Sequence, residues 1–268
     1  MLKLGYGQAS SFGFRWLDRY ADFNDAQSLR VRTGLDEWFV WHRRTQLPDY
    51  ADLLVRAQTE VLADVSPERM CAWVGEARTR LDTAVERALP IMVDVVPTLA
   101  PAQIASIEKR YRETNDEYRD DFVHRNPEKR RQKAIKRALE RAESLYGALD
   151  EAQREAIVRS VAASPFDGEV ALAERQRRQQ DAVALIRRLA TPWSNREDAE
   201  AQIRTYLGSI VRSPRESYRA YAERVLAHNC AFASSLHNTT SPAQRKAAAK
   251  KLRNYETDLR ELNAGASG

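Results

Sequence analysis

The sequence contains few of the residues that break helices and very little cysteine. Among 268 residues there are 10 Gly, 10 Pro and 2 Cys. No apolar run approaches the roughly 18 residues of a membrane-spanning helix. The 43 basic and 38 acidic residues are spread along the whole chain, unlike the one-sided basic tail of many nucleic-acid binders. We therefore expect no membrane-spanning helix and no nucleic-acid partner.

Catalytic motifs are missing as well. The four His residues show no HExxH or similar metal-binding spacing, and no Ser or Cys nucleophile motif accompanies them. His42 shares a helical face with Trp38 and Phe39, so we interpret it as a packing residue and not as a general base. We predict that the protein is not an enzyme and that it holds no cofactor.

Apolar residues, in contrast, recur at helical spacing almost throughout the chain. Met70, Trp73 and Val74 begin one such stripe, which continues for five turns. Each stripe is about one face wide, which indicates half-buried helices. Abundant Ala, Leu, Arg, Glu and Gln favour helix formation further. The pattern predicts an all-α protein, an elongated multi-helix array or bundle of roughly ten helices with no significant sheet.

One short run, from Ile91 to Val96 between two prolines, has the composition of a strand. Because a single short run cannot form a sheet, we interpret it as a kinked helix end or a buried linker, and as the best internal boundary. The expected organisation is a tether-like segment at 1–13, an N-terminal helical unit at 14–96 and a C-terminal helical unit at 97–264. The two units could also pack as one domain.

Several helices are predicted to start with the same device. A Gln stands three residues after each start, where its side chain can bind the N-cap amide. In three of the four Gln-bearing starts the first residue also carries a side-chain oxygen that can bind the N3 amide. The intervals between these Gln residues are 76, 50 and 91 residues, too irregular for a solenoid. We therefore interpret them as recurrent capping and not as an internal repeat. Ser213 begins the same pattern with Glu216 in place of Gln. The Gln-bearing starts are Asn24 to Gln27, Ala100 to Gln103, Asp150 to Gln153 and Ser241 to Gln244.

Three longer stretches carry a resemblance to a known family. They are Arg15 to Gln27, Trp41 to Tyr50 and Leu236 to Arg245, and shorter matches extend it over nearly the whole chain. The sequence resembles a domain-of-unknown-function family of helical lipoproteins from Gram-negative bacteria. Its members carry a lipobox Cys, a short tether, a Trp-rich helix and a "WHR…LP.Y" helix junction. The resemblance implies export, lipid anchoring and a periplasmic location at the outer membrane, but no established activity.

The first residues bear on the same question. Met1-Leu2-Lys3 leads into a Gly- and Ser-containing stretch that has neither an apolar h-region nor a lipobox. Taken alone, this start predicts a cytoplasmic protein; under the resemblance, we expect Met1 to replace the native anchor segment. A looser similarity links the Gln-bearing helix starts to the L-T-x-x-Q motifs of small helical periplasmic chaperones.

The compartment decides how the two cysteines are interpreted. Cys71 and Cys230 are 159 residues apart. In the cytosol two such residues are most often buried free thiols, whereas a periplasmic location implies a disulfide. That bond would join the N-terminal unit to the C-terminal helix pair and stabilise the fold by about 4–5 kcal/mol on the chain-entropy model.

The sharpest metal-site candidate is a set of four side chains at i, i+4, i+7 and i+11. This face lies opposite the apolar stripe of the same helix, so we favour a solvent-exposed face unless another helix covers it. Asn115 lies at the edge of the apolar face, and we predict that it is buried and hydrogen-bonded. The four candidate ligands are Glu113, Glu117, Asp120 and His124.

Two further groups of residues could bind partners. Six basic side chains share one helical face and could bind anionic lipid or polysaccharide, although neighbouring Glu residues favour a solvated face. They are Lys129, Arg130, Lys133, Lys136, Arg137 and Arg141. Trp16, Trp38 and Trp41 could pack in the core or form a partner surface close to the membrane tether.

These observations favour a binding function. The expected protein is exported, natively lipid-anchored and a protein-binding, scaffolding or chaperone-like module of the cell envelope, with an unidentified envelope protein as its partner. One alternative is a metal-binding or enzymatic protein that uses the acidic face. Another is a protein that binds anionic lipid or polysaccharide through the basic face.

Overall fold

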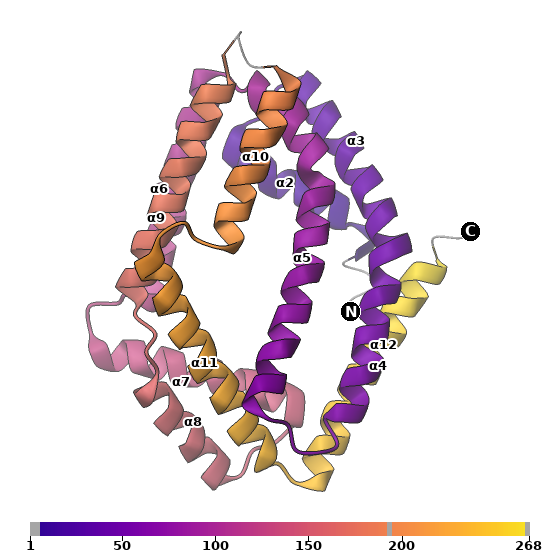
Figure 1. Cartoon of the computed structure of the whole chain (residues 1–268), viewed down its shortest axis with the longest axis vertical. Helices are drawn as coiled ribbons and strands as arrows, with labels where there is room; N and C mark the ends of the chain where they lie inside the picture. Colours follow the sequence, from indigo (N-terminus) through magenta and orange to yellow (C-terminus); the bar gives the residue numbers. More distant parts are fainter. Residues whose placement is uncertain (1–5, 192–194, 266–268) are drawn as a thin grey trace. The chain divides into compact units, whose positions relative to one another are not determined.

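A computed structural model describes residues 6–191 and 195–265 of the protein. Every regular element in these ranges is helical (Figure 1), which confirms the all-α prediction. The α-helices are α2 (Ala9–Ala21), α3 (Asp25–Trp41), α4 (Leu47–Glu60), α5 (Pro67–Val95), α6 (Pro101–Phe122), α7 (Pro127–Tyr146), α8 (Glu151–Ala163), α9 (Gly168–Leu189), α10 (Arg196–Val211), α11 (Glu216–Asn238) and α12 (Pro242–Ala264). A π-helical turn, η1 (His42–Gln46), and a 3-10 turn, η2 (Val96–Thr98), complete the description.

The predicted capping boxes form at the starts of α3, α8 and α12. At each start the N-cap side chain accepts the amide of the Gln, and the Gln side chain accepts the N-cap amide. At α6 the N-cap is Ala100, which has no side-chain acceptor, but Gln103 Oε1 still accepts the Ala100 amide at 2.9 Å. Local sequence therefore sets where these four helices begin.

The start predicted at Ser213 is wrong. Helix α11 begins at Glu216, three residues later. The Ser213 hydroxyl donates to Glu174 Oε1 at 2.7 Å, and it accepts the Arg215 amide at 3.2 Å. A buried carboxylate needs donors, so the contact with α9 decides the conformation at Ser213.

The chain divides into two compact units, and each is assembled from three separate segments. Unit 1 comprises residues 1–43, 80–120 and 169–219; unit 2 comprises 44–79, 121–168 and 220–268. This differs from the predicted division near residue 96, because helix faces pack against partners far along the chain, which local periodicity cannot show. The predicted tether is also wrong for residues 9–13, which belong to α2, whereas residues 1–5 lie outside the described ranges.

Each unit has its own apolar core. In unit 1, Leu189 of α9 packs with Ala199 and Ile203 of α10 and with the C-terminal half of α5. In unit 2, Ile157 of α8 and Ala248 of α12 are both fully buried. Truncation of such a buried Leu or Ile to Ala commonly costs about 2–5 kcal/mol, so each core contributes substantially to the stability of the fold.

The strand-like run at Ile91–Val96 is the end of a helix, as predicted. Helix α5 continues through Pro90 to Val95, and η2 follows at once. No single helix among residues 6–191 and 195–265 is long and apolar enough to cross a membrane; α5 with η2 meets that test only together with α6, and the pair is bent by 119°.

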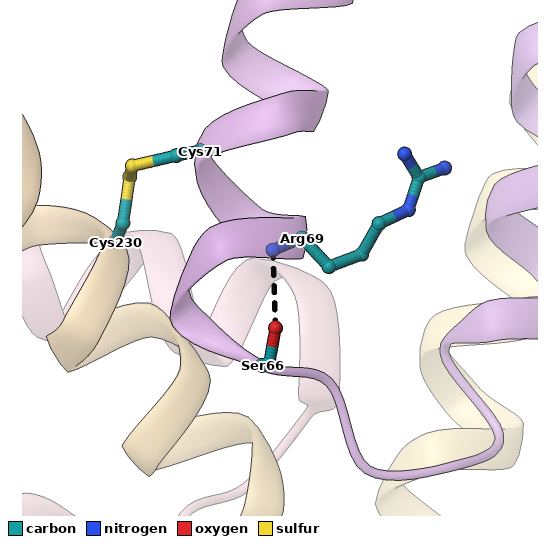
Figure 2. The surroundings of a disulfide bond; sticks show 4 residues. All are labelled: Ser66, Arg69, Cys71 and Cys230. Atoms are coloured by element: carbon teal, nitrogen blue, oxygen red, sulfur yellow. Dashed lines mark hydrogen bonds between the residues drawn. A yellow bond between two sulfur atoms is a disulfide. The ribbon is translucent and has the colours of Figure 1, made fainter.

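The predicted disulfide is present in unit 2. Cys71 near the start of α5 is bonded to Cys230 of α11, with their Cα atoms 5.4 Å apart (Figure 2). Figure 2 also shows the start of α5, where the Arg69 amide donates to Ser66 Oγ at 3.2 Å. The bond fixes the beginning of α5 against the middle of α11.

Candidate functional site

Unit 1 contains a cavity of about 640 Å³ whose wall is rich in aromatic side chains. Its lining comes from α2, α3, α5, α6, α9, α10 and the start of α11 and includes Ile91 and Met92 of α5. Trp16 is 53% exposed and Ile210 is 38% exposed, so the wall reaches the surface of the unit. The aromatic lining residues are Trp16, Tyr20, Phe23, Tyr111, Tyr206 and Tyr218, together with Tyr118.

A buried carboxylate belongs to this wall. The side chain of Glu174 is only 1% exposed. Its Oε1 accepts hydrogen bonds from Ser213 Oγ at 2.7 Å and from Arg178 Nε at 3.1 Å. Its Oε2 is buried and accepts no hydrogen bond from any residue that the structure describes. An unsatisfied buried acceptor is costly, and the guanidinium of Arg177, whose Nη1 lies 4.0 Å from Oε2, offsets part of that cost.

Two arginines next to Glu174 also line the cavity. Arg175 donates to Asn115 Oδ1 at 2.9 Å and to Thr114 Oγ1 at 3.1 Å. Arg178 lies over the ring of Tyr218, with its guanidinium carbon 5.3 Å from the centroid. Contacts on several sides hold both guanidinium groups in place, and these groups supply charged donors within an otherwise apolar wall.

The prediction for Asn115 is confirmed. It is 6% exposed and exchanges hydrogen bonds with Gln179 at 2.8 and 3.1 Å. This pair joins α6 to α9 beside the arginines.

Two of the lining tyrosines are buried enough that desolvation raises the pKa of Tyr111 and of Tyr206 above the ordinary value, so both hydroxyls stay protonated at neutral pH.

The three predicted tryptophans do not form one surface. Trp16 lines the cavity and lies 5.0 Å from Tyr20, centroid to centroid. Trp38 instead stacks on His42 at 4.7 Å and donates its indole hydrogen to the Ala84 carbonyl at 2.9 Å. Trp41 packs against Trp38. Only Trp16 therefore belongs to the cavity, and the other two pack around His42, as the core interpretation expects.

The acidic face does not extend as predicted. Helix α6 ends at Phe122, so His124 lies outside it. A new helix begins at Pro127 with Asn126 as its N-cap, and a residue that precedes a proline disfavours the helical conformation. Glu113 pairs with Arg110 at 2.9 Å, and Glu117 lies 3.7 Å from the same guanidinium. Among the described residues, no three His, Cys, Asp or Glu side chains are grouped so that they could hold a metal ion.

The basic face on α7 is largely engaged within unit 2. Lys133 pairs with Asp121 at 3.1 Å and Lys136 with Glu140 at 3.8 Å. Arg137 lies over the Phe122 ring at 4.5 Å, and Arg130 donates to the His124 carbonyl at 2.6 Å. Arg141 lines a cavity of unit 2, and Lys129 is exposed.

Unit 2 has a cavity of about 530 Å³, lined by α4, α5, α7, α8, α11 and α12. His237 is 1% exposed at its wall; its Nδ1 and the Tyr146 hydroxyl are 2.9 Å apart, and its Nε2 is 2.8 Å from the Ala63 carbonyl oxygen. Burial raises the pKa of Tyr146 to about 12. Trp73 and Phe232 also line this cavity.

Sequence reasoning missed Glu174, Arg175 and Arg178, although a signal for them exists. They stand at helical spacing on the same stripe of α9 as Ala182 and Leu185, which are buried. Charged residues that continue an apolar stripe are candidates for buried, paired groups.

The comparison with known families identifies the chain's relatives. Residues 19–205 match a family of unknown function, DUF6279. The chain belongs to this family. Neither a curated protein nor a solved structure matches this DUF6279 chain.

Proposed function

We propose that this DUF6279 protein is a non-enzymatic module of the cell envelope that binds an apolar segment of an extended or unfolded polypeptide in the cavity of unit 1. The observation that carries the proposal is the cavity itself, with its aromatic wall, its exposed Trp16 and the two arginines, Arg175 and Arg178, that line it. Aromatic residues and Arg are the side chains that contribute most to protein recognition.

The polar groups of the cavity favour a polypeptide over a lipid. An acyl chain presents one headgroup and an apolar body, whereas a polypeptide presents N–H donors and C=O acceptors along its whole length. The cavity offers both complements, because Arg175 and Arg178 in its wall can donate to carbonyl oxygens, while the hydroxyls of the lining tyrosines can accept an N–H. A volume of about 640 Å³ also exceeds what one side chain would fill.

The location belongs to the same proposal. The resemblance to Gram-negative lipoproteins supports export and a native lipid anchor at the periplasmic side of the outer membrane. The Cys71–Cys230 bond supports an oxidising compartment. The binding partner would then be another envelope protein, which this protein would bind while part of the partner's chain is still extended.

The alternatives have weaker support. On the acidic face, Glu113 and Glu117 share Arg110, which competes with a metal ion. On the basic face, Lys133 and Lys136 have carboxylate partners, which weakens attraction to an anionic lipid surface.

The test is a binding titration with a blocked, fluorescein-labelled peptide, Ser-Leu-Phe-Val-Leu-Ser, followed by fluorescence anisotropy. Trp16→Asp places a charge on the wall of the cavity and should weaken binding at least about tenfold, which corresponds to about 1.4 kcal/mol. Leu29→Asp is the matched control, because Leu29 is 69% exposed in unit 1 and does not line the cavity.

The control should bind like the parent. No binding by the parent protein, or equal losses in both variants, would refute the proposal. Displacement of the peptide by oleate with higher affinity than by unlabelled peptide would assign the cavity to a lipid instead.

A further inference from the structure

The Gln residues that begin α3, α6, α8 and α12 form two pairs with one hydrogen-bond pattern. Gln27 and Gln103 exchange hydrogen bonds between their amide groups at 3.2 and 2.7 Å in unit 1. Gln153 and Gln244 do the same in unit 2, at 2.9 and 2.8 Å. The interpretation of these residues as capping and nothing more is therefore incomplete, because each also binds a partner far along the chain.

The pairs agree in a second, stricter respect. The Nε2 of each Gln also donates to the carbonyl that lies five residues before its partner Gln. The four bonds are Gln27 to Thr98, Gln103 to Asp22, Gln153 to Thr239 and Gln244 to Ala148, at 2.9–3.2 Å. The helix before the first Gln of each pair is followed by a residue with positive φ, Asp22 (φ 47°) after α2 and Gly147 (φ 80°) after α7.

The chain order of the two units repeats in the same way. Along the sequence, the segments belong alternately to unit 1 and unit 2. The first half of the chain gives its outer segments to unit 1 and its middle segment, 44–79, to unit 2. The second half gives its outer segments to unit 2 and its middle segment, 169–219, to unit 1. Each unit is thus completed by helices from the other half, unit 1 by α9 and α10 and unit 2 by α4 with the start of α5.

This order explains the irregular spacing of the Gln residues. The interval is 76 residues from Gln27 to Gln103 and 91 from Gln153 to Gln244, a difference of 15. The middle segment 169–219 is longer than 44–79 by the same 15 residues. An insertion in one middle segment therefore hides the repeat from any test for a constant period.

The two cavities occupy equivalent positions under this alignment. With Gln27 matched to Gln153 and Gln103 to Gln244, seven aligned positions line both cavities. In α2 and α7 these are Trp16 with Ala142 and Tyr20 with Tyr146. In α5 with η2 and in α11 they are positions 91, 92, 95 and 96 with 232, 233, 236 and 237, and in α6 and α12 position 111 with 252. The cavities are therefore the same feature of one repeated helical plan.

We propose that the chain is an internal duplication and that the unit 2 cavity is a second site for the same class of ligand, so that one chain binds two apolar polypeptide segments. This inference rests on the proposed function of the unit 1 cavity. The unit 2 wall is apolar and aromatic like its counterpart, and it also has polar groups, the guanidinium of Arg141 and the carboxylate of Glu60, which is paired with Arg69 at 2.7 Å. A polypeptide with its donors and acceptors suits it for the same reason.

Isothermal titration calorimetry of the full chain with unlabelled Ser-Leu-Phe-Val-Leu-Ser tests the inference. The parent should bind two peptides per chain. Trp16→Asp should leave one site, and Asn229→Trp, which fills the unit 2 cavity from an exposed position on α11, should leave the other. The double variant should bind none, and Phe232→Ala provides a second way to impair the unit 2 site if Asn229→Trp does not fold.

The outcomes separate the two proposals. A parent stoichiometry of one, abolished by Trp16→Asp, overturns the second site and leaves the proposed function standing. No heat of binding and no anisotropy change in the parent overturns both. A stoichiometry of two that Asn229→Trp and Phe232→Ala, both folded, leave unchanged places the second peptide elsewhere and also overturns the inference.

Discussion

Replacement of Gln153 by Met should destabilise the protein far more than the loss of a typical side-chain amide that makes one hydrogen bond. Gln153 is 2% exposed. Its side chain accepts from the Asp150 amide and donates to the Thr239 carbonyl, at 3.1 and 3.2 Å. It also exchanges two hydrogen bonds with Gln244, at 2.9 and 2.8 Å. Methionine has a similar length but can replace none of these four bonds.

The size of the effect follows from those contacts. A typical intramolecular hydrogen bond contributes about 0.5–1.5 kcal/mol net, and a buried group left without a partner costs about 1–3 kcal/mol. Four lost bonds, with the amide of Gln244 left partly unsatisfied, should lower the free energy of unfolding by about 3–4 kcal/mol. Gln244→Met removes the same two inter-glutamine bonds, so the double variant should cost about 2 kcal/mol less than the sum of the single variants.

Urea unfolding followed by far-UV circular dichroism and by tryptophan fluorescence measures these values, and coincidence of the two probes tests for a two-state transition. Gln132→Met on the surface of α7 is the matched control, because its side chain is exposed and donates only to Glu128. It should change stability by less than about 0.5 kcal/mol. A cost below about 1 kcal/mol for Gln153→Met, or strict additivity in the double variant, would show that the pair is not coupled as described.

Three other expectations are open to direct measurement. Reduction of the Cys71–Cys230 bond should lower the thermal midpoint and decrease the free energy of unfolding by up to about 5 kcal/mol on the chain-entropy model. A variant with both Cys replaced by Ala should not respond to the reductant, and a mass of the unreduced protein that shows two free thiols would contradict this prediction. Burial lowers the pKa of His42 in the folded protein, so on acidification the unfolded state takes up a proton first. The contribution of His42 to stability is therefore complete above about pH 6.5 and should be lost as the pH falls further. An equal loss of stability in His42→Gln would assign the effect to another group. Gly168→Ala should destabilise the protein by roughly 1–3 kcal/mol, because the added Cβ would lie 2.3 Å from the Phe122 carbonyl oxygen; unchanged urea unfolding would show that this backbone can move.

The candidate site was only partly foreseeable. The stripe pattern and the spacing of Asn115 were enough to predict a buried, hydrogen-bonded amide, because both depend on the geometry of one helix. Glu174 could be noticed as a charge on an apolar stripe, but its pairing with Ser213 could not be predicted, since Ser213 lies 39 residues further along, in the connection between α10 and α11. The prediction that the acidic face extends to His124 was wrong for a local reason, because α6 ends before His124 and a new helix begins at Pro127.

The sequence by itself determined the helices and most of their starts. Periodicity and capping act within a few residues, so Asn24, Asp150 and Ser241 could be placed as N-caps without any tertiary information. It also limited the cysteines to one possible intramolecular pairing. Tertiary structure alone decided that the helix starts meet in pairs and that the Ser213 hydroxyl binds Glu174 and does not cap α11. It also decided that each unit contains a segment from both halves of the chain. These features depend on contacts between residues tens to hundreds of positions apart, and no local pattern carries information about such contacts. The Gln residues show the difference most clearly, because their capping role is local and their pairing is not.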